Sequence, residues 1–195
     1  MYKNSIEQVD KNQPYAFVIP AAQHDYSSAL RMIDILLFGG VEIHEAKADF
    51  VAGGKVYPAG SFVVKMAQPY KPYAWALLER QKYPDLRQYP GGPPIPPYDN
   101  AGWTLPLQMG VACDQVEEPF EAQLEEIEKA PRPAAVLPEA SAPYAVLDSR
   151  ANASSSAAFA LLREKAEVYR SKEAGQGTGF QAPAGSFLVK NSPAV

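Results

Sequence analysis

The sequence predicts an α/β fold in which a β-α-β-hairpin unit occurs twice, in a mixed sheet or sheets, with a proline- and aromatic-rich irregular segment between the two copies. Three observations support this prediction. Similar blocks of sequence recur in one order, each copy has an apolar stripe at helical spacing between two short apolar runs, and a glycine-rich turn follows. Alternating strands and helices are typical of the α/β class.

Internal repetition predicts the domain organisation. Three pairs of blocks are similar, 14–19 with 143–148, 41–43 with 166–168, and 57–65 with 182–190. The second copy is about one helical turn shorter, and the alignment puts this gap between the helix and the strand that follows it. We therefore expect an N-terminal tail (1–13), a first α/β repeat (14–66), a proline- and aromatic-rich segment (67–116), an acidic helix and linker (117–142) and a second α/β repeat (143–195).

The first copy carries a separate signal for each element. Tyr15 to Ile19 is a continuous apolar run between two prolines, which is typical of a buried strand. Asp25 and the serines after it offer N-cap oxygens to an amphipathic helix, and Gly39-Gly40 ends that helix. Val41 to His44 is the second strand. A β-α-β unit is parallel and right-handed in nearly all known cases, so we expect this arrangement here.

A hairpin and a third strand complete each copy. Gly53-Gly54 lies between two short apolar runs, where both positions of a two-residue turn tolerate positive φ. Ser61 to Met66 then predicts a strand. In the second copy, Asn152 and Ser154 to Ser156 are the cap candidates of the helix, its apolar stripe lies over 158–162, and the strand after it covers 167–169.

The segment between the copies has a different composition. Gln68 to Pro106 combines many prolines with tyrosines and tryptophans, and only Tyr73 to Gln81 has a helical pattern. Glu117 to Lys129 predicts an acidic helix, because Phe120, Leu124 and Ile127 fall along one side of it. Residues 131–142 are rich in alanine and proline, as linkers often are.

Composition excludes several classes of partner. The chain has 195 residues, 47% of them hydrophobic, and 22 acidic against 18 basic side chains give a formal charge of −4. This balance argues against nucleic acid as a partner. No apolar run approaches the roughly 20 residues of a membrane span. The polar N-terminus resembles no secretory signal, so we expect either a protein that stays inside the cell or a piece of a longer chain.

Neither metal nor nucleophilic chemistry is predicted for this chain. The two histidines, His24 and His44, fit neither His-x-x-Glu nor His-Glu-x-x-His, so no zinc site and no other cofactor is expected. Cys113 lacks the strand-to-helix elbow of a catalytic thiol, and a structural role is expected for it. Ser61 and Ser186 both follow Ala-Gly and are interpreted as turn residues.

Two kinds of position remain as candidate ligand sites. In open α/β sheets, ligands bind at strand-to-helix turns, which makes Gln23, His24, Arg150 and Asn152 weak candidates for contacts to a small polar ligand. Exposed aromatic residues beside prolines bury large areas at low entropic cost. Candidate interface or ligand-facing residues of this kind are Tyr70, Tyr89, Tyr98 and Trp103.

Several motifs resemble a known family. They are the runs at 14–20, 57–64, 67–72, 81–86, 90–94 and 97–106, of which the last, Pro-Tyr-Asp-Asn-Ala-Gly-Trp-Thr-Leu-Pro, is the most specific. Together they resemble the region downstream of the peptidase domain in large bacterial zinc carboxypeptidases of the carboxypeptidase A superfamily. The resemblance covers most of the chain from Pro14 onward, and it transfers no catalytic residue, because the zinc ligands, the glutamate base and the carboxylate-binding arginine belong to the upstream domain.

The resemblance implies an accessory role. It implies a non-catalytic α/β module, not an enzyme by itself, whose partner is the peptidase domain of the same polypeptide and which packs on that domain or shapes access to it. Zinc is then expected only in the parent peptidase domain, and the parent is expected to be exported, to the periplasm or outside the cell. Two alternatives stay open: a stand-alone glycan- or peptide-binding module that uses the aromatic segment, and an enzyme with a site at the two strand-to-helix turns.

Overall fold

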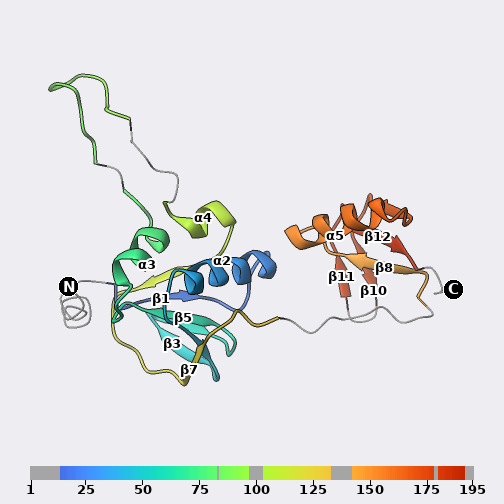
Figure 1. Cartoon of the computed structure of the whole chain (residues 1–195), viewed down its shortest axis with the longest axis horizontal. Helices are drawn as coiled ribbons and strands as arrows, with labels where there is room; N and C mark the ends of the chain where they lie inside the picture. The colour runs from blue at the N-terminus through green and yellow to red at the C-terminus, as the bar shows by residue number, and fades with distance from the viewer. Residues whose placement is uncertain (1–13, 83, 97–102, 133–141, 178–179, 192–195) are drawn as a thin grey trace.

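The structure is a computed structural model, and it describes residues 14–82, 84–96, 103–132, 142–177 and 180–191 (Figure 1). Its elements form two lobes, which we call the first lobe (residues 14–132) and the second lobe (residues 142–191). The described helices are α2 (Tyr26–Phe38), α3 (Lys71–Leu78), α4 (Leu105–Met109) and α5 (Asn152–Arg163). The strands of the first lobe are β1 (Ala16–Ile19), β2 (Ile43–Ala46), β3 (Phe50–Ala52), β4 (Lys55–Tyr57), β5 (Phe62–Lys65), β6 (Asp114–Val116) and β7 (Leu124–Ile127). Those of the second lobe are β8 (Tyr144–Leu147), β9 (Val168–Arg170), β10 (Gly175–Gly177), β11 (Phe180–Ala182) and β12 (Phe187–Lys190).

The α/β class is confirmed, but the expectation of mixed sheets is wrong. The first-lobe sheet has the order β6-β1-β5-β2-β7, and every strand pairing in the described residues is antiparallel. β1 and β2 do run in the same direction, as a β-α-β crossover requires, but β5 lies between them and is antiparallel to both. The hairpin β3–β4 reverses the chain before β5 and thereby allows this insertion.

Two apolar clusters cover the two faces of the first-lobe sheet. On one face, Phe17 and Phe62 pack under Ile33 of α2. On the other face, Val18 and its neighbours pack under the β3–β4 hairpin, whose Phe50 contributes to that cluster. Side chains of a strand alternate between the two faces, so a strand buried on both sides is continuously apolar. That explains the unbroken run of β1, all of whose residues are buried.

The predicted acidic helix over 117–129 is wrong, because part of this segment is the strand β7. Leu124 and Ile127 are three residues apart, which is the spacing of one helical face but of opposite faces in a strand. Leu124 packs into the hairpin-side cluster and Ile127 into the helix-side cluster. The open edge of β2 pairs with β7 over its whole length, so tertiary pairing overrides a helical pattern. The helix predicted at 73–81 is present as α3, which begins two residues earlier and ends three residues earlier.

The second lobe has the strand order β8-β12-β9, with α5 and the hairpin β10–β11 in the connections. The order and pairing match β1-β5-β2, α2 and β3–β4 of the first lobe. Few of its apolar side chains are fully buried: Ala158 of α5 is, whereas Phe159 and Leu162 of the same helix are 66% and 48% exposed. The second lobe is therefore covered much less completely than the first.

The alignment of the first strand is wrong by one residue. Ile19 pairs with Phe62 in the first lobe, and Leu147 pairs with the corresponding Phe187 in the second, although the sequence blocks matched Ile19 with Asp148. A shift of one residue moves every side chain to the other face of the sheet. Sequence similarity between short apolar runs does not distinguish the two registers, because both faces of β1 are apolar.

The shortening of the second copy also lies elsewhere than expected. Six residues separate β1 from α2, but four separate β8 from α5, and α5 is one residue shorter than α2. After the helix the two lobes are alike, since Val41 and Ala166 donate equivalent backbone hydrogen bonds to Leu36 and Leu161. The deletion therefore falls mainly in the strand-to-helix turn, whose length is least constrained by packing.

Candidate functional site

A cleft lies between the two lobes, where the strand-to-helix turns of both lobes face each other. Its volume is about 900 Å³, and it is lined by the first turns of α2 and α5 and by the loops that precede them. All four ligand candidates from these turns line it: Gln23, His24, Arg150 and Asn152. The sequence did not predict that the two turns would meet.

Asp25 joins the helices α2 and α5 on the two sides of the cleft. It is the N-cap of α2 and accepts hydrogen bonds from the backbone amide of Ser28 at 3.2 Å and from the Ser27 hydroxyl at 2.5 Å. The same carboxylate accepts the backbone amide of Asn152, the first residue of α5, at 3.0 Å. One carboxylate therefore meets the positive ends of two helices.

The environment of Asp25 keeps it ionised. Burial alone would raise the pKa of this carboxyl, but the hydrogen bonds from Ser27, Asn152 and Ser28 outweigh burial and lower the pKa to about 2. The residue is only 5% exposed. Hydrogen-bond donors from both sides of the cleft thus stabilise the charge of this carboxylate, which has a structural role there.

Asn152 and Gln23 also use their side chains within the protein. The Asn152 Nδ2 donates to the Ser28 hydroxyl across the cleft at 3.1 Å. Gln23 donates from Nε2 to the carbonyls of Pro20 and Ala112, at 2.8 and 3.0 Å, and accepts the Ala112 amide at 2.9 Å. Gln23 therefore joins the first turn to the segment before β6, and both residues position the cleft walls.

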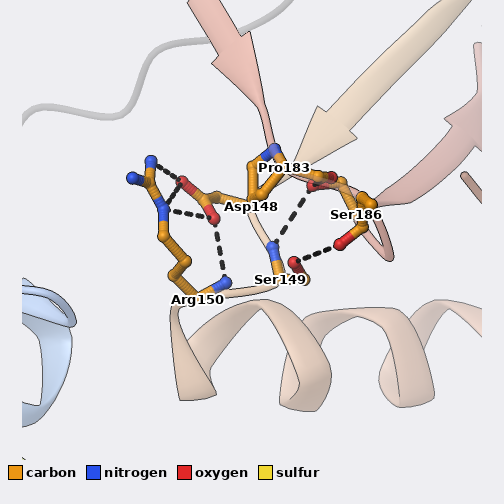
Figure 2. Close-up of polar contacts among 6 residues, drawn as sticks. Asp148, Ser149, Arg150, Pro183 and Ser186 are labelled. Atoms are coloured by element: carbon orange, nitrogen blue, oxygen red, sulfur yellow. Dashed lines mark hydrogen bonds and ion pairs between the residues drawn. The ribbon is translucent and has the colours of Figure 1, made fainter. Parts of the chain in front are cut away.

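Arg150 is held at the mouth of the second-lobe turn (Figure 2). Its guanidinium forms an ion pair with Asp148 at 2.5 Å, and its backbone amide donates to the same carboxylate at 2.8 Å. The hydrogen bond from Arg150 is the largest cause of a lowered Asp148 pKa, and the charge of His24 on the opposite wall lowers it further. This wall of the cleft thus carries both signs of charge.

Ser61 and Ser186 are turn residues, as predicted. The Ser186 hydroxyl donates to the Pro183 carbonyl at 2.8 Å and accepts the Ser149 amide at 3.5 Å (Figure 2). Ser61 does the same with the Pro58 carbonyl and the Ala21 amide. Both hydroxyls are buried and both of their hydrogen-bonding roles are used, so each serine fixes the end of its central strand.

Sequence reasoning missed two charged residues of the cleft. Arg31 and Asp34 lie on α2 and line it beside His24. Ser28, Arg31 and Asp34 follow one another at intervals of three residues and therefore lie on one face of α2. Only the position of α5 shows that this face meets the second lobe. The cleft is therefore lined by side chains of both charges.

Cys113 and His44 are the other side chains of the first lobe that bear on nucleophilic or metal chemistry. In the described parts of the chain, no group of three or more His, Cys, Asp or Glu side chains could hold a metal ion. Cys113 is half-buried, and burial raises the pKa of its thiol to about 12. His44 lies within β2. Its pKa is lowered mainly by burial and to a smaller extent by the charge of Lys65. Its Nδ1 atom is buried and has no hydrogen-bond partner.

The described aromatic candidates, Tyr70, Tyr89 and Trp103, lie in three different segments of the first lobe. Tyr70, at the start of α3, is 46% exposed and packs over Gly40. Tyr89 lies in the segment 84–96 and is 61% exposed, and Trp103 is half-buried just before α4. Tyr98 lies outside the described residues. The structure thus brings together the turn candidates and separates the aromatic ones.

Comparisons with known proteins identify no relative. Neither protein-family models, nor curated proteins, nor solved structures match this chain. Among the described residues, no helix has the length and apolar character that crossing a membrane requires.

Proposed function

We propose that this chain is a non-catalytic accessory module of a zinc metallocarboxypeptidase and packs against the peptidase domain of the same polypeptide, where it shapes access to the active site. The proposal rests on the sequence motifs that resemble the region downstream of such domains. The structural observation that supports it is one projecting segment, which we call the arm (residues 84–96).

The arm stands away from the first lobe as a long hairpin (Figure 1). Its hydrogen bonds join residues of the arm to one another, such as the Ile95 amide to the Leu86 carbonyl at 2.7 Å and the Gly92 amide to the Tyr89 carbonyl at 2.8 Å. Three large apolar side chains are exposed on it, Leu86 at 48%, Tyr89 at 61% and Ile95 at 40%. Such side chains are typical of an interface core.

The chain segments before and after the arm are joined by hydrogen bonds. The Thr104 hydroxyl donates to the Glu79 carbonyl at 3.0 Å and accepts the Gln81 amide at 3.2 Å. These bonds hold residues 79–81, at the end of α3, beside Thr104, at the start of α4. A surface held at its base and exposed along its length suits docking to a neighbouring domain.

The two lobes, we further propose, are two copies of one unit. Support comes from the equal order of their elements, from equivalent strand pairings and from the equivalent bonds of Ser61 and Ser186. In this proposal the duplication is architectural, and the unrepeated arm carries the interaction.

The test is binding between the purified chain and the peptidase domain of its parent polypeptide, measured by calorimetry. We expect Tyr89→Ala to weaken binding about 30-fold, because aromatic anchors are often worth about 2 kcal/mol. Phe159→Ala is the matched control, since it removes an equally exposed aromatic ring from α5 and should leave binding unchanged.

Two results would contradict the accessory role. One is zinc-dependent release of C-terminal residues from peptides by the purified chain alone. The other is binding to the peptidase domain that the arm variant does not affect. Saturable binding of a cell-wall glycan or of a peptide to the arm, lost in Tyr89→Ala, would instead support the stand-alone binding module.

A further inference from the structure

The two lobes differ at one edge of their central sheets. In the first lobe, the outer edge of β2 is covered by β7, which pairs with it antiparallel from Ile43 to Ala46. β9 has the place of β2 in the second-lobe sheet, beside the central strand. In the part of the chain that the structure describes, no strand pairs with the outer edge of β9.

The backbone of this edge is arranged to accept a strand. The Ser171 amide donates to the Ser186 carbonyl, and the Glu167 carbonyl accepts the Lys190 amide, so both groups point inward to β12. Backbone groups alternate in direction along a strand. The amides and carbonyls of Val168, Arg170 and Lys172 therefore point outward, at the spacing that an antiparallel neighbour requires.

The first lobe shows what kind of segment covers such an edge. Lys47 donates its backbone amide to the Gln123 carbonyl at 2.8 Å, and its ammonium forms an ion pair with Glu125 of β7 at 2.9 Å. Lys172 holds the corresponding place, because Ser171 before it makes the same bond to the turn serine as Ala46 does. An exposed lysine thus stands on both edges, and in the first lobe a glutamate pairs with it.

Charge selects the occupant of the β9 edge. The residue that corresponds to Glu45 of β2 is Arg170, whose exposed guanidinium donates to the Gly185 carbonyl at 3.2 Å. The β9 edge therefore carries two basic side chains, Arg170 and Lys172, where the β2 edge has one acid, Glu45, and one base, Lys47. Two identical edges of this kind would repel each other, which disfavours pairing between copies. An acidic strand such as β7, Leu-Glu-Glu-Ile, complements them.

We propose that the outer edge of β9, from Val168 to Lys172, binds an acidic polypeptide segment in extended conformation, which extends the second-lobe sheet as an antiparallel strand. Main-chain hydrogen bonds supply the geometry of such binding, and side chains at alternate positions supply specificity. Apolar residues on either side of the acidic pair would contact the half-buried Val168 and the exposed Tyr169. This surface is separate from the arm, so its failure would leave the accessory role unaffected.

The experiment uses the whole chain and a peptide with the sequence of residues 122–128, which contains β7 with its two glutamates and a third glutamate, Glu128, just after it. Binding is followed by amide chemical shifts in the assigned protein. We expect saturable shifts at Val168, Arg170 and Lys172. Lys172→Glu should weaken binding about fivefold or more, whereas Lys82→Glu, an exposed lysine of the first lobe, should not change it.

Three outcomes would overturn the proposal. One is the absence of shifts at β9 with peptide at about 1 mM. Another is equal binding of a peptide whose strand amides are N-methylated, because such a peptide keeps its charge but cannot add to a sheet. The last is a response confined to Ile43–Ala46, which would show exchange with β7 in place of binding to β9.

Discussion

At the scale of single residues, Asp25 shows how one side chain acquires a role beyond the local one. The sequence offers Asp25 as an N-cap candidate together with Ser27 and Ser28, and the structure shows that Asp25 is the cap. Its contact with the Asn152 amide joins residues far apart in the chain. Replacing Asp25 therefore affects the start of its own helix and the junction of the lobes together.

We predict that Asp25→Ala lowers the free energy of unfolding by about 2 kcal/mol. Loss of a cap costs about 1 kcal/mol, and amide donors left without their acceptor add a similar amount. Asp85→Ala removes an exposed carboxylate of the arm and should change stability by less than about 0.5 kcal/mol. Urea denaturation of both variants checks this, and equal effects would contradict the role of Asp25.

The stability of the protein should depend on pH through the titration of Asp25. Its pKa is about 2 in the folded protein and 3.8 without structure, so the unfolded state binds the proton more readily. The stabilisation is complete above the higher value and is lost as the pH falls from about 4 to about 2. The difference in unfolding free energy between the native chain and Asp25→Asn should shrink across this window. A difference that stays constant would be evidence against the assignment.

At the scale of elements, equivalent helix ends are made from different residues. α2 is followed by Gly40 with φ of 82°, whereas α5 is followed by Lys165 with φ of 63°. Glycine adopts this left-handed region without steric cost, but a residue with a Cβ does not. The second lobe therefore keeps the same C-cap geometry with an unfavourable residue.

We predict that Lys165→Gly stabilises the protein by about 0.5–1 kcal/mol, because it relieves this strain. Glu164→Gly, one residue earlier, should destabilise it, since Glu164 has φ of −78° and gains nothing from glycine. Thermal unfolding of the two variants distinguishes them. A decrease in stability for both would mean that Lys165 is not strained.

At the scale of the whole molecule, two hydrogen bonds between described residues link the lobes at the cleft. Both involve Asn152, whose amide binds Asp25 and whose side chain binds Ser28. Asn152 is the first residue of α5, where proline is tolerated, and Ala151 before it already has the extended conformation that proline demands. A proline at this position can therefore remove the link and leave the helix intact.

Asn152→Pro should allow the lobes to separate without loss of helix. We expect unchanged circular dichroism but a larger radius of gyration in small-angle X-ray scattering, and unfolding in two transitions in place of one. Asn152→Ser keeps the backbone donor and should behave much more like the native chain. An unchanged radius of gyration in Asn152→Pro would show that other contacts hold the lobes.

The sequence by itself determined the class of the fold, the order of strands, helix and hairpin within residues 14–66 and 143–190, and the strand-to-helix turns, because these depend on local signals. Apolar runs, caps at Asp25 and glycine turns act within a few residues of the chain. Only the tertiary structure decided the insertion of β5 between β1 and β2, the strand conformation of β7, the register of β8 and the meeting of the two turns at one cleft. Each of these depends on pairing between residues distant in the sequence, for which a local pattern holds no information: Leu124 and Ile127 fit one face of a helix as well as two faces of a strand, and the sheet edge beside them made the choice.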